Sequence, residues 1–360
     1  MISAQDGDIY RAATEAGVPV DEIVDFSGNI SPCAVPDAVR EALARSADLL
    51  NRYPDACAAA LRAAAAPVYG VKPENILAGA DTTEFIYAVP RGLRPRRAVI
   101  SAPGTPHYWR ACDQCGAEAE GILAPEEADF VPDMTQIEHH LGGADLLFIG
   151  HPADPTGLCA DAEALRRLAG LFPSAIFVAD ETHMDFVPES MTTSLLSAAL
   201  PPNILVLRSL SPCGLAGLRV GFCIGAPDLL GLVERVREPW TLNVPAQLAA
   251  EALLTGPRDL AALRAPVIAE RERLRDEIGH LPGLRVFRSQ ANFLLLKITK
   301  PNLTSAMLCD RLLRQNCLVR NASGYRGLNG KFIRLSARTV PENDRLLVAL
   351  RMALDDARWK

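Results

Sequence analysis

Short, almost purely apolar runs recur through the middle of the chain, separated by stretches with helical periodicity. The apolar runs are Ala98–Ala102, Leu146–Gly150, Ala175–Asp180, Ile204–Ser209 and Val220–Gly225. Continuous apolar runs of this length predict strands that are buried on both faces of a sheet. Helical stretches such as Ala162–Leu171 lie between them. Because strands and helices alternate, we predict an α/β fold with a mainly parallel sheet covered by helices on both sides.

The pattern changes at the two ends of the chain and predicts three parts. Residues 1–45 contain a short helix around Ile9–Glu15 and then an extended segment, and we expect them to form an arm that joins the small domain. Residues 46–245 are expected to form the large domain. Residues 246–360 are expected to form a smaller α+β domain, which opens with a helical stretch broken near Gly256-Pro257. Its predicted strands are Leu284–Arg288, Asn292–Ile298 and Phe332–Ser336, with a closing helix after Pro341.

Composition and charge narrow the possible classes of function. The 360 residues are 49% hydrophobic and 22% charged, as in an ordinary globular protein. The net charge of −6 and the absence of a basic run argue against a nucleic-acid partner. No apolar stretch reaches the roughly 18 residues of a membrane span, and the N-terminus lacks the features of a signal peptide. We therefore expect a cytoplasmic protein, whose nine cysteines are reduced thiols.

Polar residues gather at the carboxyl ends of the predicted strands, which is where open α/β sheets bind ligands. Two histidine–aspartate pairs stand out there, His151-x-x-Asp154 and Asp180-x-x-His183, and His107 follows another strand. Only six histidines occur in the chain, so three of them at strand ends favour a functional crevice over chance.

The two pairs together predict a divalent metal site. Two imidazoles and two carboxylates suit iron, manganese or zinc, with His151, Asp154, Asp180 and His183 as the ligands. His183, Asp154 and His107 are the candidate catalytic groups. Two other interpretations stay open: a histidine–aspartate acid–base couple without a metal, and a solvated crevice with no catalytic function.

Several segments, in this order along nearly the whole chain, resemble one enzyme family. They are Phe26-Ser27-Gly28-Asn29-Ile30, Gly79-Ala80-Asp81-Thr82, Pro155-Thr156-Gly157, Gly214-Leu215-Ala216-Gly217-Leu218-Arg219 and Phe332-Ile333-Arg334. The chain resembles the fold-type I pyridoxal-phosphate enzymes, in the branch that holds histidinol-phosphate aminotransferase and threonine-phosphate decarboxylase. Its ending, with Tyr325 and Arg338, looks most like the threonine-phosphate decarboxylases. The resemblance implies an aminotransferase-like large domain and a smaller C-terminal domain.

The resemblance also implies roles for individual residues. A phosphate cup would consist of the amides of Ala80, Asp81 and Thr82 at a helix start, with Ser209, Arg219 and the partner subunit's Tyr53. This arrangement implies a homodimer with shared sites. Asp180 would hold the pyridine nitrogen of the cofactor protonated. Asn29, Arg334 and Arg338 would contact a small anionic substrate.

The residue that defines the family's covalent chemistry is missing. Where the family has a lysine after Ser-Leu-Ser or Ser-Leu-Thr, this chain reads Ser209-Leu210-Ser211-Pro212-Cys213-Gly214, one residue short, and it has no lysine from 73 to 296. Without that amine no Schiff base forms. The aromatic residue that stacks on the cofactor corresponds to Thr105, and an asparagine of the site corresponds to Asp154. We therefore expect pyridoxal phosphate to bind non-covalently at best.

These features lead to one hypothesis about function and two alternatives. The hypothesis is a metal-assisted reaction on a small anionic substrate, either phosphorylated or amino-acid-like. The first alternative is an enzyme of decarboxylase or transaminase type that uses pyridoxal or pyridoxamine phosphate non-covalently, with His183 as the base. The second alternative is a non-catalytic, ligand-binding relative.

Overall fold

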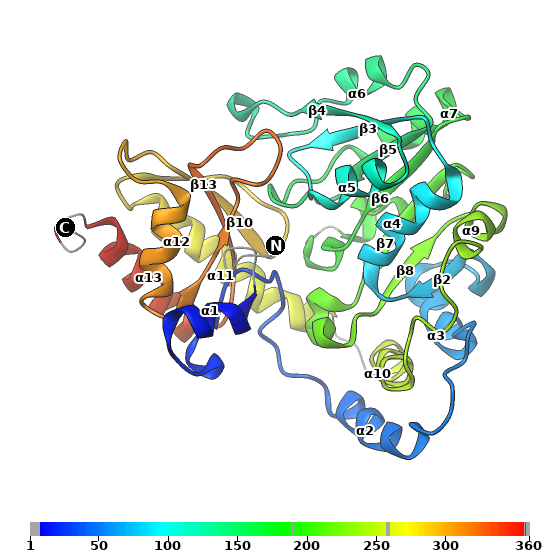
Figure 1. The fold of residues 1–360 in the computed structure, drawn as a ribbon, viewed down its shortest axis with the longest axis horizontal. Coiled ribbons are helices and arrows are strands. Elements are labelled where there is room, and N and C mark those ends of the chain that lie inside the picture. Colours follow the sequence, from blue (N-terminus) through cyan, green and yellow to red (C-terminus); the bar gives the residue numbers. More distant parts are fainter. Residues whose placement is uncertain (1–7, 189, 257–259, 356, 358–360) are drawn as a thin grey trace.

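The structure, a computed structural model, describes residues 8–188, 190–256, 260–355 and 357. Within these ranges the strands form a seven-stranded sheet, a four-stranded sheet and a two-stranded pair. The two larger sheets lie in opposite halves of the molecule, each with its own helices (Figure 1). The predicted large, mainly parallel α/β domain and the predicted smaller α+β domain are both confirmed, and the sheet of the smaller domain is antiparallel.

The large sheet has the strand order β2-β8-β7-β6-β5-β3-β4. Its strands are β2 (Ile76–Gly79), β3 (Arg97–Ala102), β4 (Glu118–Leu123), β5 (Leu146–Gly150), β6 (Ile176–Asp180), β7 (Ile204–Ser209) and β8 (Gly221–Ile224). Neighbours from β4 through β7 pair in parallel, whereas β8 pairs antiparallel with both β2 and β7. The five apolar runs that predicted strands match β3, β5, β6, β7 and β8 to within one residue at each end.

Helices bury both faces of this sheet, as the apolar runs predict (Figure 1). Alternate strand residues belong to different cores: Val99 and Leu147 pack on one face, and Ile100 and Phe148 on the other. The first face is covered by α3 (Ala59–Tyr69), α6 (Met134–His140), α7 (Ala162–Leu171) and α10 (Val244–Thr255), and α2 (Asp37–Ser46) packs against α10. The second face is covered by α4 (Asp81–Leu93), α5 (His107–Gln114) and α9 (Pro227–Glu234).

The small sheet is antiparallel, with the order β12-β13-β10-β9. Its strands are β9 (Leu284–Val286), β10 (Phe293–Ile298), β12 (Arg320–Asn321) and β13 (Phe332–Ser336). It shares a core with α11 (Leu260–Gly279), α12 (Ser305–Leu313) and α13 (Val340–Leu354). The predicted helix break is confirmed where α10 ends at Thr255, although Pro257 lies outside the described residues.

The N-terminal segment packs on the small sheet. The helix α1 (Ile9–Ala16) leads to β1 (Val24–Asp25), which pairs in parallel with β11 (Cys317–Leu318). Phe26 continues the contact, because its amide donates to Leu318 and its carbonyl accepts from the amide of Ser336. The arm therefore contacts the small sheet, while the boundaries at residues 45 and 245 stay a prediction. In the described part of the chain no helix combines the length and apolarity needed to cross a membrane.

Candidate functional site

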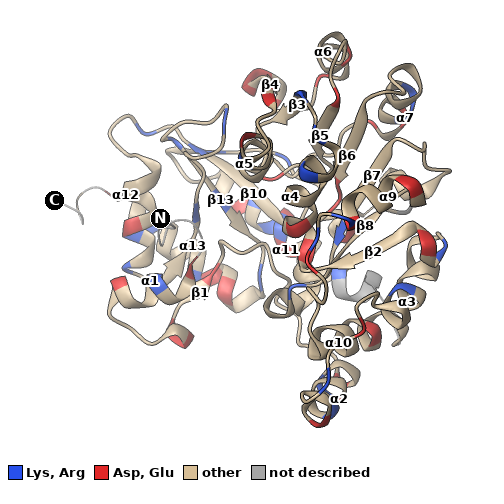
Figure 2. Ribbon diagram, turned by 45° about the vertical axis from the view of Figure 1, so that its right-hand side comes forward, with Lys and Arg blue, Asp and Glu red and all other residues tan. Residues whose placement is uncertain are grey.

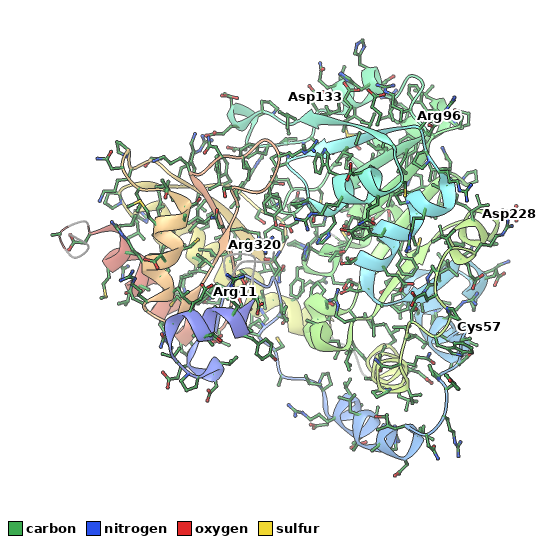
Figure 3. All side chains as sticks on the ribbon, in the orientation of Figure 1. Arg11, Cys57, Arg96, Asp133, Asp228 and Arg320 are labelled. Atoms are coloured by element: carbon green, nitrogen blue, oxygen red, sulfur yellow. The ribbon has the colours of Figure 1, made fainter. Side chains whose placement is uncertain are left out.

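A cleft of about 780 Å³ lies between the large domain, the small sheet and the arm. It is lined by Ser27, Gly28, Thr105, Pro106, His107, Arg110, Asp154, Arg219, Arg320, Asn321, Gly324, Tyr325 and Arg334. Figure 3 shows Arg320 in the middle of the molecule, where the small sheet faces the large domain. Figure 2 shows basic and acidic segments of the ribbon meeting in the same region. An inner cavity of about 150 Å³ shares Thr105, His107 and Asp154 with the cleft and extends to Asp180 and His183. The strand ends thus meet as predicted.

The start of α4 and the end of β7 form the predicted phosphate cup, but a protein carboxylate sits at its centre. Asp81, the first residue of α4, is only 3% exposed. Its carboxylate accepts hydrogen bonds from Ser209 Oγ at 2.6 Å and Ser211 Oγ at 2.5 Å, and Arg219 Nη1 lies 2.5 Å away. The amide of Thr82 donates to the same carboxylate at 2.7 Å. Of the residues predicted for the cup, Thr82, Ser209 and Arg219 contact Asp81. The amide of Ala80 donates to Glu84 instead.

The register of three strands fixes the shape of this cup. Gly221 of β8 pairs with Gly79 of β2 on one side and with Ser209 of β7 on the other. A Cβ atom on Gly221 would lie 2.7 Å from the amide nitrogen of Thr82, so only glycine allows this approach of β8 to the start of α4. The strand ladder thus holds the serine and the helix start in place together.

Asp180, the last residue of β6, is hydrogen-bonded on both oxygens. Tyr108 donates its hydroxyl to Oδ2 at 2.8 Å, and the hydroxyl of Thr182 donates to Oδ1 at 2.5 Å. Burial raises the pKa of Asp180 above its ordinary value, although these hydrogen bonds act to lower it. The Tyr108 ring stacks on Phe148 with ring centroids 4.9 Å apart, which fixes the position of its hydroxyl.

Asp154 forms an ion pair with Arg334, the arginine expected to bind substrate. Arg334 Nη1 lies 2.5 Å from Asp154 Oδ1, and the hydroxyl of Tyr325 donates to Asp154 Oδ2 at 3.0 Å. Arg334 Nη2 also donates to the backbone oxygen of Ser27. Burial by itself would raise the pKa of Asp154, but the charge and hydrogen bond of Arg334 outweigh it and hold the pKa below its ordinary value. Asp154 is therefore an ionised partner of Arg334.

The two cleft histidines are held neutral by their surroundings. Burial lowers the pKa of His183 to about 4, and its ring meets Phe293 edge-on with centroids 5.0 Å apart. Its Nδ1 is buried and has no hydrogen-bond partner among the described residues. Burial, with the charges of Arg110 and Arg320, also lowers the pKa of His107, whose Nδ1 lies 3.1 Å from the Tyr87 hydroxyl.

His151 does not face the cleft, and the predicted four-residue metal site is wrong for that reason. It is fully buried, with Nε2 2.9 Å from the carbonyl oxygen of Thr193 and Nδ1 accepting from the amide of Ala160 at 3.1 Å. Both ring nitrogens therefore bind backbone. Asp154 and Asp180 already bind protein donors, and no group of three or more His, Cys, Asp or Glu in the described ranges is arranged to hold an ion.

Three other predicted residues lie outside the lining of the cleft. Tyr53 is 83% exposed and contacts Trp240 with ring centroids 5.1 Å apart. Arg338 donates to the backbone oxygen of Asp25 at 3.0 Å and to Glu342 at 2.9 Å. Asn29 is buried beside the cleft residue Gly28. The roles proposed for these residues stay predictions.

Two cleft arginines were missed in the sequence. Arg110 follows His107 by three residues on α5, and this spacing places both on one helix face, which was a usable signal. Arg320 gave no such signal, because it lies in the two-residue strand β12. The register of β12 with β13 places Arg320 beside Arg334.

Comparisons with known proteins bear on the family and the fold of this chain. The sequence model of the family described as "Aminotransferase class I and II" matches residues 21–350. The chain is 35% identical to threonine-phosphate decarboxylase of Salmonella typhimurium, over 98% of this chain and 97% of the relative. It is 33% identical to histidinol-phosphate aminotransferase 1 of Burkholderia lata, over 88% and 87%. The crystal structure of histidinol-phosphate aminotransferase from Sinorhizobium meliloti in complex with pyridoxal-5'-phosphate superimposes with a TM-score of 0.86 at 21% identity, covering 97% of this chain and 95% of the other.

The residues of the site do not fit covalently held pyridoxal phosphate. No lysine occurs from 73 to 296, and the amine of Lys297 lies 2.6 Å from Glu126, outside the cleft lining. The carboxylate of Asp81 fills the cup in which a phosphate would sit, and Thr105 offers no aromatic face. From the match over residues 21–350 and the 35% identity along nearly the whole chain, the protein belongs to the class I and II aminotransferase family.

Proposed function

We propose that this chain binds a small phosphorylated, amino-acid-like anion in its cleft and has lost the covalent pyridoxal-phosphate chemistry of its family. The observation that carries the proposal is the charge of the cleft lining. Four arginines line it, Arg110, Arg219, Arg320 and Arg334. Asp154 pairs with Arg334 and Asp81 pairs with Arg219, so the arginines outnumber these two carboxylates by two charges. No lysine stands at the motif position to form a Schiff base.

The arrangement of these charges supports a ligand that carries both a negatively charged and a positively charged group. Arg110 and Arg320 supply planar, permanently charged groups of the kind that bind phosphate. Asp154 is ionised and lines both the cleft and the inner cavity, so it offers a partner for an ammonium group. A phosphorylated amino acid has both groups on one short skeleton. The Salmonella typhimurium relative is named for threonine phosphate, and we extend that ligand class to this chain.

Calorimetric titration with O-phospho-L-threonine, beside L-threonine and inorganic phosphate, tests the proposal. We expect saturable binding of the phosphorylated amino acid. We also expect Arg320→Gln to weaken it by about tenfold or more, since one charge-assisted contact contributes roughly 1.5–3 kcal/mol. Arg167→Gln is the matched control, because Arg167 pairs with Glu138 on the surface away from the cleft. If O-phospho-L-threonine binds no better than L-threonine, the proposal is wrong.

A second candidate is an enzyme that uses pyridoxal or pyridoxamine phosphate without a covalent link, with His183 as the proton acceptor. It is supported by Asp180, which lies at the end of β6 on the same inner cavity as His183. The low pKa of His183, about 4, weakens this candidate because it makes the imidazole a poor base. Absorbance titration with each cofactor, followed by turnover assays with amino acids, separates the two candidates.

A further inference from the structure

The anion at the centre of the phosphate cup belongs to the protein. We propose that Asp81 substitutes internally for a phosphate group and closes this cup to phosphorylated ligands. The inference deepens the proposed function, because it directs the phosphate of a ligand toward Arg110 and Arg320 and away from the cup.

The contacts of Asp81 are those that a bound phosphate would make. Two hydroxyls, one guanidinium and one helix-start amide converge on its carboxylate, from Ser209, Ser211, Arg219 and Thr82 at 2.5–2.7 Å. These donors come from α4, from the end of β7 and from the segment after it, so elements distant in the sequence converge on one carboxylate. Asp81 is only 3% exposed, so its carboxylate itself occupies the space among these donors.

The charges in the cup also oppose the binding of a second anion. In the described part of the chain, the guanidinium of Arg219 is the cation that contacts the cup, and its charge is balanced by Asp81. A phosphate entering the cup would lie against a buried carboxylate, and like charges at contact distance repel strongly where little water screens them. A phosphate can therefore bind in the cup only after the Asp81 side chain has left.

The backbone shows that Asp81 is held in this position. Its φ is +71°, in the left-handed region that non-glycine residues seldom adopt, and its hydrogen bonds oppose the return to an ordinary conformation. Glycine adopts this conformation freely, and asparagine tolerates it better than most residues. Asp81→Gly and Asp81→Asn therefore open or neutralise the cup without imposing a new backbone strain.

Equilibrium dialysis with radiolabelled inorganic phosphate tests the inference. Asp81→Gly should bind phosphate at least about tenfold more tightly than the parent chain, and Asp81→Asn should show a smaller gain in the same direction. Adding Arg219→Gln to Asp81→Gly should abolish the gain, because the phosphate then loses its cationic partner. Asp161→Asn is the matched control: Asp161 also accepts from helix-start amides, those of Glu163 and Ala164 on α7, but lies outside the cleft lining.

The results of this dialysis experiment can be distinguished from those of the titration that tests the proposed function. Equal phosphate affinity in the parent, Asp81→Gly and Asp81→Asn chains, with circular dichroism showing all three folded, overturns the inference. So does a gain that persists after Arg219→Gln, because the phosphate would then be bound elsewhere. Binding of O-phospho-L-threonine that depends on Arg320 leaves the proposed function standing in either case. If Asp81→Gly does not fold, Asp81→Asn decides the question alone.

Discussion

Replacing Asp154 by alanine should cost this protein a large part of its stability, because it leaves the buried charge of Arg334 without its ionic partner. Arg334 is 5% exposed, and its Nη1 lies 2.5 Å from Asp154 Oδ1. Removing one member of a buried ion pair typically destabilises a protein by about 3–5 kcal/mol. Arg334 keeps its hydrogen bonds to Ser27 and Tyr325, so we expect the lower end, about 3 kcal/mol. Asp154→Asn removes the charge but retains a hydrogen-bonding oxygen, so this variant should lose less stability than Asp154→Ala.

Urea unfolding followed by circular dichroism measures this difference. The midpoint should fall clearly for Asp154→Ala while the slope of the transition stays the same. Glu138→Ala is the matched control, since the Glu138–Arg167 pair has a similar distance, 2.7 Å, but lies exposed, where ion pairs contribute little. If Asp154→Ala and Glu138→Ala shift the midpoint equally, the buried Asp154–Arg334 pair contributes no more to stability than an exposed ion pair.

Three further predictions follow from the site. Because the folded-state pKa of His183 is lowered to about 4, its neutral form stabilises the fold above the ordinary histidine pKa. That contribution is lost as pH falls toward 4, and about 2 kcal/mol of it is lost by pH 5. In thermal unfolding at several pH values, the unfolding temperature of His183→Gln should therefore change less with pH than that of the parent chain. Borohydride treatment with pyridoxal phosphate should leave no pyridoxyl-lysine at the cleft, and a reduced pyridoxyl-lysine at Lys72 or Lys297, found by mass spectrometry, would contradict this expectation. If Tyr53 and Trp240 lie in a homodimer interface, light scattering should show a dimer, and Tyr53→Asp together with Trp240→Ser should shift it toward monomer; a monomeric parent chain at micromolar concentration rules this out.

Much of the fold could be predicted from local pattern, because burial on both faces leaves an unbroken apolar run. The runs that became β3, β5, β6, β7 and β8 were of this kind. The edge strand β4 was missed, since five of its six residues are exposed or half-buried and it carries no such run. β2 is only four residues long and ends in Gly79, so its signal was weak as well.

The candidate site was predicted in its location but not in its contacts. Strand ends located Asp154, Asp180 and His183 correctly, because the carboxyl ends of parallel strands meet at one edge. Spacing could not show that His151 turns inward to bind backbone groups, because a side chain's direction beyond a strand end depends on the following loop. Nor could it show that Asp81 occupies the cup, which depends on the tertiary approach of Ser209 and Ser211.

The pairing of Gly79, Gly221 and Ser209 across three strands has a consequence for how such sequences are interpreted. Because β8 can approach the start of α4 only through a glycine, the packing of the sheet alone requires Gly221, whatever the site binds. Such a residue is required by the sheet itself, so its presence does not show which reaction the site performs. A glycine of this kind shows that the sheet is intact. The residues that line the site have to be assessed one by one before an activity is assigned to the chain.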